Sequence, residues 1–235
     1  MTNERMNRRV GVGAVVLAIL MGVSSVTLLA GTAAERLGES AAVLKEVMNA
    51  PDQGIPEDLL NSAYCVVIVP GVKQVALGIG GKYGRGFAVC RNRAGATWGP
   101  PAAVRMEGGS VGFQIGASET DVVMLVMDQR SMNGILSSKF TIGGAAEAAA
   151  GPVGRSSTAQ TDATMHAKIL SYSRSRGAFA GVALTGATLR QDLDENREMY
   201  SRRIENKTIL KSGLKTPVGG EELLALLNKY SRKET

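Results

Sequence analysis

Two arginines, Arg174 and Arg176, stand two residues apart in the segment LSYSRSRG, directly before a glycine-rich apolar run. Alternate residues of a strand point to the same side, so Tyr172 would share a face with both arginines. Guanidinium forks and nearby backbone N–H groups could together bind phosphate oxygens. The same row could instead be a solvated strand face whose charges oppose edge-to-edge pairing. Spacing alone leaves both interpretations open.

Patterns for catalysis and metal binding are missing from the sequence. His166 is the only histidine, which excludes two-histidine metal motifs, and no serine lies in a G-x-S-x-G elbow. A serine–histidine pair assembled in space stays open as a hydrolase alternative. Asp192, Asp194 and Glu195 stand at an expected helix start, where carboxylates cap the helix and interact with its dipole. We therefore predict a non-catalytic protein without a metal.

The glycine runs around Lys82 do not fit a nucleotide-binding loop. GIGGKY lacks the Ser or Thr that should follow the lysine, and the first glycine of a P-loop would fall at Ala76. GGKYGRG reverses the G-x-G-x-x-G order, and no helix is expected after it. The sequence therefore predicts structural glycines and no cofactor.

Cys65 and Cys90 are the only cysteines, and each lies in an apolar, strand-like run. In an oxidising compartment the two could form a disulfide. Two separate buried thiols fit the same pattern. Both alternatives stay open.

The composition describes a mildly basic chain with few aromatic residues. It has 235 residues, 44% hydrophobic content, 4% aromatics and 29 glycines, so the core must be built from aliphatic side chains and closely approaching backbones. The formal net charge of +6 falls to +4 when residues 1–34 are set aside. A charge this small indicates no nucleic-acid partner and favours an anionic partner only weakly.

The N-terminal residues resemble an export signal. Arg5, Arg8 and Arg9 precede an uncharged apolar run over 11–30, and small residues follow at 31–34. This pattern predicts a signal peptide over residues 1–33, with an uncleaved membrane anchor as the alternative. Residues 34–235 are then expected to form one domain.

Helices are expected at both ends of that domain. Ala34–Ala50 carries an amphipathic pattern, and Pro56 starts a short helix that runs to about Ser62. A short helix over Arg130–Ser137 and helices over Gln191–Tyr200 and Gly220–Lys229 are expected further along, with Asn206–Gly213 as a connector.

The central part of the chain is predicted to be mostly strands. The expected strands are Tyr64–Val69, Gln74–Gly80, Arg85–Arg91, Ala102–Met106, Gly109–Ile115, Val122–Met127, Phe140–Gly143, Ala145–Ala150, Ala167–Arg174 and Ala178–Leu189. Short connections favour antiparallel pairing. Along Tyr83–Arg91 one face carries bulky residues and the other only small ones, which suits a strongly curved sheet or a closely packed helix. The predicted fold is α+β, with a curved, mostly antiparallel, barrel-like sheet and helices at both ends.

Several long motifs of this chain resemble the SYLF domain family, known from yeast actin-patch proteins and SH3-containing animal relatives. The motifs stand in the family's order between about Ala34 and Tyr200, and they read GIPEDLLNSAYCVVIVPGVKQ, GGKYGRGFAVCR, WGPPAAVRMEGGSVGFQIGASETDVVMLVM, AAAGPVGR and SYSRSRGAFAGVALTGATLR. The resemblance implies a binding domain rather than an enzyme, because eukaryotic members bind phosphoinositide-containing membranes and the yeast type also binds actin.

The resemblance also suggests which residues contact a ligand. The matching basic positions, taken as candidate lipid contacts, are Lys82, Arg91, Arg155, Arg174 and Arg176. An exported bacterial protein, periplasmic or associated with the envelope, would meet an anionic phospholipid rather than actin. The alternative is a structural or protein-interaction domain in which the basic face contacts a protein. If Arg155, Arg174 and Arg176 are instead buried and pair with carboxylates such as Glu119 or Asp121, their role would be structural.

Overall fold

Two long antiparallel strands form the centre of the fold. The computed structural model describes residues 31–50, 54–92, 97–143, 148–153, 167–175, 178–181, 184 and 186–231, without the side chains of 76–79, 110–115 and 179. Strand β1 runs over Cys65–Cys90 and β2 over Ala102–Val126, and their register extends from Cys65 opposite Val126 to Ala88 opposite Ala102. The six short strands predicted over residues 64–127 are therefore parts of two long ones, and that prediction was wrong in its boundaries.

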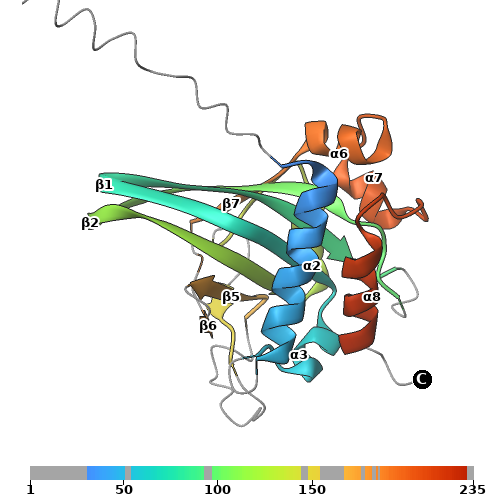
Figure 1. Ribbon diagram of the computed structural model, residues 1–235, viewed down its shortest axis with the longest axis horizontal. Helices are drawn as coiled ribbons and strands as arrows, with labels where there is room; N and C mark the ends of the chain where they lie inside the picture. Colours follow the sequence, from blue (N-terminus) through green and yellow to red (C-terminus); the bar gives the residue numbers. More distant parts are fainter. Residues whose placement is uncertain are drawn as a thin grey trace, which may run out of the picture. The chain divides into compact units, whose positions relative to one another are not determined.

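Strand β1 reverses direction along its own length. An extended strand of 26 residues would span roughly 80 Å. The Cα atoms of Cys65 and Cys90 are nevertheless only 4.0 Å apart, and the Arg91 N–H donates to the Tyr64 carbonyl. The ribbon of β1 and β2 therefore folds back on itself, with both ends of β1 close together, and it extends to the left of the helices in Figure 1.

Two glycines allow the halves of β1 to approach each other. A Cβ at Gly86 would overlap the Ile68 carbonyl oxygen, and one at Gly84 would lie 2.7 Å from a Val69 methyl group. Side chains at these positions would hold the halves apart. The small-residue face predicted for Tyr83–Arg91 thus packs against the first half of the same strand and lets the sheet curl.

Five further strands extend the sheet around this ribbon. Strand β5 (Ile169–Ser175) pairs with β2 at residues 121–126, and β7 (Thr188–Gln191) pairs with β2 at residues 104–107. The edges are formed by β3 (Lys139–Thr141), β4 (Ala148–Ala150) and β6 (Ala178–Gly181). Of the strands in the described residues, only β4 and β5 run parallel, so the predicted curved and mostly antiparallel sheet is confirmed. The strand predicted over 178–189 is instead two strands, β6 and β7, with different partners.

Helices pack on both faces of the curled sheet. Helix α2 (Ala33–Asn49) begins at Thr32, whose side chain and Glu35 form a reciprocal capping box, and α3 (Glu57–Ser62) follows it. Helix α8 (Glu221–Tyr230) packs beside α2 on the same face of the sheet (Figure 1). The remaining helices are α4 (Gln129–Ile135), α6 (Leu193–Tyr200) and α7 (Asn206–Lys211). In the part of the chain that the structure describes, no helix is long and apolar enough to cross a membrane.

The alternation of side chains along the strands divides the core in two. Val66 and Ile68 point to one side, where they pack with Leu37, Leu44 and Leu223 of α2 and α8. Their neighbours Cys65, Val67 and Val69 point to the other side, toward Ile209 and Leu210 of α7. Residues 206–213, expected as a connector, thus contain a helix, because the adjacent apolar pair Ile209 and Leu210 anchors them in this second cluster.

Candidate functional site

The predicted row of Tyr172, Arg174 and Arg176 is not a free cationic face. Tyr172 is fully buried in the α2 side of the core, and Arg176 lies outside the described residues. Arg174 contacts Glu46 of α2 and donates from Nε to the Asp121 carboxylate at 2.6 Å, while the Gly71 N–H donates to the same carboxylate. Arg174 therefore joins α2, β2 and β5, as the structural alternative predicted.

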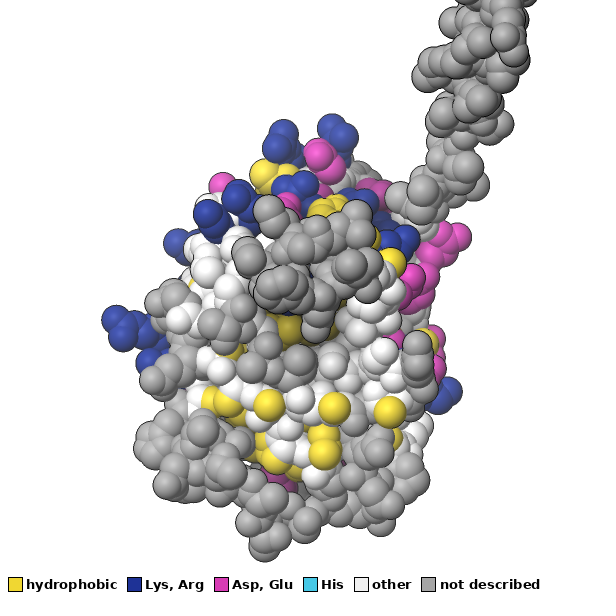
Figure 2. Space-filling model, turned by 90° about the vertical axis from the view of Figure 1, so that its left-hand side faces the viewer, with side chains coloured by type: hydrophobic (Ala, Val, Ile, Leu, Met, Phe, Trp, Pro, Cys, Tyr) yellow, Lys and Arg dark blue, Asp and Glu magenta, His cyan; other side chains and the backbone are white. Residues whose placement is uncertain are grey.

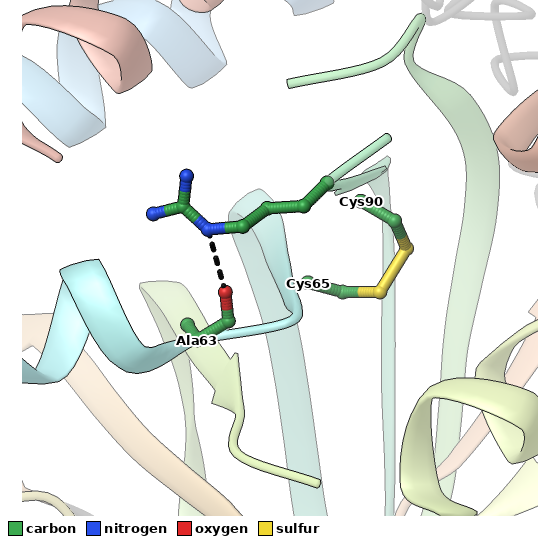
Figure 3. Close-up of a disulfide and its surroundings, with 4 residues drawn as sticks. Ala63, Cys65 and Cys90 are labelled. Carbon is green, nitrogen blue, oxygen red and sulfur yellow. Dashed lines mark hydrogen bonds between the residues drawn. A yellow bond between two sulfur atoms is a disulfide. The ribbon is translucent and has the colours of Figure 1, made fainter. Parts of the chain in front are cut away.

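Arg91, predicted as a lipid contact, is buried rather than displayed on an exposed cationic face. Only 7% of the residue is exposed, and its guanidinium carbon lies 4.3 Å from the centre of the Trp98 ring. Nε donates to the Ala63 carbonyl at 3.0 Å, as Figure 3 shows, and Nη2 donates to carbonyls at the end of α3 and to that of Ser231. The cation thus fastens the end of α3 and the end of α8 to the end of β1.

The other predicted cations do not complete a cluster. Lys82 is half-buried on β1 opposite Gly108, where an added Cβ would lie 3.1 Å from the Lys82 side chain. Arg155 lies outside the described residues, as does His166. Lys82, Arg91 and Arg174 occupy three different environments, so the structure does not bring the predicted candidates together at one site.

Cys65 and Cys90 form a disulfide between the two ends of β1 (Figure 3). Both residues are fully buried. Of the two alternatives that the sequence left open, the structure has the disulfide, and it closes the base of the ribbon beside Arg91.

The expected cap at the start of α6 is present and belongs to a buried ion-pair network. The Asp192 carboxylate accepts from the Glu195 N–H. Glu195 is 1% exposed and binds Arg36 of α2 and Arg85 of β1, and Arg85 also binds Asp192. Burial raises the pKa of the Glu195 carboxyl, and the two arginines oppose that shift. These carboxylates hold α6 against α2 and β1, and they are enclosed rather than open to a substrate.

The positive charge of the domain gathers where sequence reasoning did not look, on α6, α7 and their flanking turns. Residues 35–235 contain 24 Lys and Arg against 20 Asp and Glu, and the segment 197–215 alone contains six against two. The net +4 of this segment equals that of all of residues 35–235. Local net charge would have revealed it in the sequence.

Four exposed cations of this segment form what we call the cationic surface: Arg202, Arg203, Lys207 and Lys215. In the described part of the chain, no carboxylate lies within 4.0 Å of any of them. Figure 2 shows Lys and Arg side chains gathered along its upper edge, the edge at which α6 and α7 lie in Figure 1. Unpaired, exposed cations on one edge can attract an anionic surface.

Two buried asparagines hold this segment in place. The Asn196 side-chain oxygen accepts from the Ala103 N–H at 2.8 Å, and its amide donates to Asn206 at 2.7 Å and to the Ile204 carbonyl. Asn206 in turn donates to the Ala103 carbonyl. Both amides are inaccessible to solvent. The turn that carries Arg202 and Arg203 is therefore anchored to β2 at both ends. On α7, Ile209 is buried and Lys207 is on the exposed face.

No group of three or more His, Cys, Asp or Glu side chains is placed to hold a metal among the described residues. The described residues thus present exposed cations on a curled sheet that a disulfide closes.

Comparison with known proteins gives a consistent result. A family model described as "Ysc84: Las17-binding protein actin regulator" matches residues 107–230. Protein YSC84 of Saccharomyces cerevisiae is 33% identical over 181 residues, which are 75% of this chain and 38% of that protein. The human SH3 domain-containing YSC84-like protein 1 is 29% identical over 201 residues, which are 83% of this chain and 58% of that protein. The chain thus spans less than two thirds of either relative.

Proposed function

The chain belongs to the Ysc84 (SYLF) family, and from this premise we propose that it is a non-catalytic domain that binds anionic phospholipid at a membrane surface. Phosphatidylinositol-type headgroups belong to the same chemical class. The observation that carries the proposal is the cationic surface, because Arg202, Arg203, Lys207 and Lys215 are exposed and lie in the segment 197–215, whose net charge of +4 equals that of residues 35–235. Cations near an anionic membrane each contribute about 1 kcal/mol to binding.

The disulfide supports the compartment in which this binding would occur. Disulfides persist in oxidising environments such as the bacterial periplasm. Cys65 and Cys90 are joined in the core of the fold, and the N-terminal sequence has the pattern of an export signal. We therefore propose that the protein acts at the bacterial cell envelope, outside the cytoplasm, where phospholipid headgroups rather than actin would be available.

A second candidate function is protein interaction through the same surface. It is favoured by the family description, which names a Las17-binding protein and actin regulator, and by the SH3 domains in the names of relatives. An acidic protein partner would use the same cations. The two functions differ in whether pure lipid is sufficient for binding.

Vesicle flotation tests the proposal. The full chain should float with vesicles that contain phosphatidylglycerol and remain unbound with pure phosphatidylcholine, and binding should weaken as salt rises, because charges are screened over about 8 Å at physiological ionic strength. Equal flotation with both lipids, or with neither, would contradict a headgroup-dependent lipid function and favour the protein-interaction alternative.

A further inference from the structure

A pocket that none of the residues of the cationic surface line lies where the ends of α3, β1 and α7 meet α4. Its volume is about 660 Å³, within the range of about 300–1,000 Å³ that is usual for small-molecule sites. The described residues that line it include two cations, Arg91 and Lys211, and no Asp or Glu. The pocket is therefore electropositive by composition.

Among the described residues, the positive charge of Arg91 has no anionic partner. Its hydrogen bonds go to carbonyl oxygens, and Nη1 has no partner at all among the described residues. No carboxylate of the described part of the chain lies within 4.0 Å of the guanidinium. Burial lowers the pKa of Arg91, as expected for a desolvated cation without a counter-charge. A buried cation in this state is costly, and an anion beside it would remove part of that cost.

The rest of the lining combines polar groups with an apolar wall. Lys211 stands at the end of α7 and is exposed, while Gln129 and Asn133 are one turn apart on α4 and both contribute to the pocket. Met132 and Leu210 contribute the apolar part of the lining. Asn61, on the α3 side, has a buried side-chain oxygen without a hydrogen-bond donor. An occupant with an oxyanion, a hydroxyl or amide donor and a short apolar part would match these groups.

We propose that this pocket binds a small organic oxyanion, a phosphate or carboxylate carried on a short apolar group, with Arg91 and Lys211 supplying the positive charge. Lys211 provides mobile ammonium donors at the entrance, and the fixed guanidinium provides charge in the wall. The residues of the cationic surface do not line the pocket, so the site does not depend on the membrane function. The anion could be free or the headgroup of a lipid.

The single tryptophan of the chain offers a direct measurement, because Trp98 stacks on Arg91. The full chain is titrated with inorganic phosphate, hexanoate, dihexanoylphosphatidate and, as a zwitterionic control, dihexanoylphosphatidylcholine, and Trp98 fluorescence is recorded. We expect a saturable change with at least one of the three anions and none with the control. Binding of phosphate alone indicates a free anion, whereas binding that requires the acyl chains indicates a lipid.

Two exposed lysines, one in the lining and one outside both the pocket and the cationic surface, provide the matched variants. Lys211→Ala should weaken anion binding about tenfold or more, the effect of losing a hydrogen bond to a charged group, with an unchanged thermal melt. Lys45→Ala removes the same charge from α2 and should leave the affinity unchanged. Arg91→Lys, where it folds, should weaken binding and shift the Trp98 spectrum. Absence of saturable binding, or equal effects of Lys211→Ala and Lys45→Ala, would overturn the proposal.

Discussion

Arg174 and Asp121 lie directly opposite each other on β5 and β2, and the Arg174 Nη2 is 2.5 Å from the Asp121 carboxylate. The same carboxylate accepts the N–H of Gly71, which has a positive φ of 55° at the irregularity between Val69 and Val72 in β1. One pair thus connects three segments of the curled sheet, and the contact of Arg174 with Glu46 adds α2. The arginine that the sequence singled out as a phosphate ligand is part of the framework.

The first prediction concerns this pair. Arg174→Ala should lower the free energy of unfolding by about 1.5–3 kcal/mol, because the half-buried Asp121 loses a charged hydrogen-bond donor. Urea denaturation measures the change. Lys45→Ala, an exposed lysine next to Glu46 on α2, is the control and should stay within about 0.5 kcal/mol of the wild type. If Arg174→Ala has wild-type stability but weaker vesicle binding, Arg174 is a lipid contact and not a structural residue.

The disulfide should stabilise the fold without being needed to form it. In the chain-entropy model, a loop of this length contributes about 3.5 kcal/mol, so Cys65→Ala with Cys90→Ala should lower stability by that order and still give a folded protein. The comparison is a urea titration of the wild type with and without reductant. A reductant effect that persists in the double variant would show that the loss has another cause.

Gly86 should tolerate no side chain. Gly86→Ala places a methyl group onto the Ile68 backbone and should cost about 1–3 kcal/mol or prevent folding, because neither half of β1 can move away without breaking its pairing with β2. Gly109 is the matched control on β2, since a Cβ there meets nothing within 4 Å. Gly109→Ala should be neutral or stabilise by about 0.4–1 kcal/mol. Similar melting temperatures for the two variants would contradict the close packing of β1 on itself.

The buried Tyr172 and the partly buried Tyr200 should respond in opposite directions to loss of the hydroxyl. Tyr200 donates to the Pro101 carbonyl at 2.6 Å, so Tyr200→Phe should cost about 1 kcal/mol. The Tyr172 hydroxyl is buried without a partner among the described residues, so Tyr172→Phe should be neutral or stabilising. Chemical denaturation of both variants tests the contrast, and a clear loss of stability in Tyr172→Phe would reveal a partner for that hydroxyl.

The same tyrosines predict an alkaline loss of stability. Burial raises the pKa of both phenols above the usual value near 10. Above roughly pH 10 the unfolded chain therefore releases protons that the folded state retains, and stability falls as pH rises. The pH dependence of the urea midpoint between pH 9 and 11.5 measures this. Tyr172→Phe should reduce the slope, and an unchanged slope would show that Tyr172 ionises normally in the folded state.

The cationic surface should dominate vesicle binding. Arg202→Ala with Arg203→Ala should cost about 2 kcal/mol, or roughly thirtyfold in affinity for phosphatidylglycerol vesicles, and should reduce the salt dependence. Folding should be unaffected, because both side chains are exposed. Lys45→Ala with Lys139→Ala removes the same charge from exposed positions on α2 and β3. Equal losses for the two double variants would mean that net charge, rather than this surface, controls binding.

Much of the fold could be predicted from local patterns. The helices at both ends follow from amphipathic spacing and from caps such as Thr32 and Asp192, and the sheet follows from alternating apolar residues and glycines. These patterns depend on residues a few positions apart, and the helices and strands that they predict are present in the tertiary structure. The motifs of the SYLF family were sufficient to identify the family, because they occur in order along most of the chain.

Only the tertiary structure decided which cations remain available. In the sequence, Arg91 and Arg174 carry the same charge as Arg202 and Arg203. In the structure, Arg91 is buried against Trp98 and Arg174 pairs with Asp121. The disulfide is likewise a consequence of β1 doubling back, which brings together residues separated by 25 positions. Partners that meet across such distances are fixed by the folding of the whole sheet, and no local pattern encodes them.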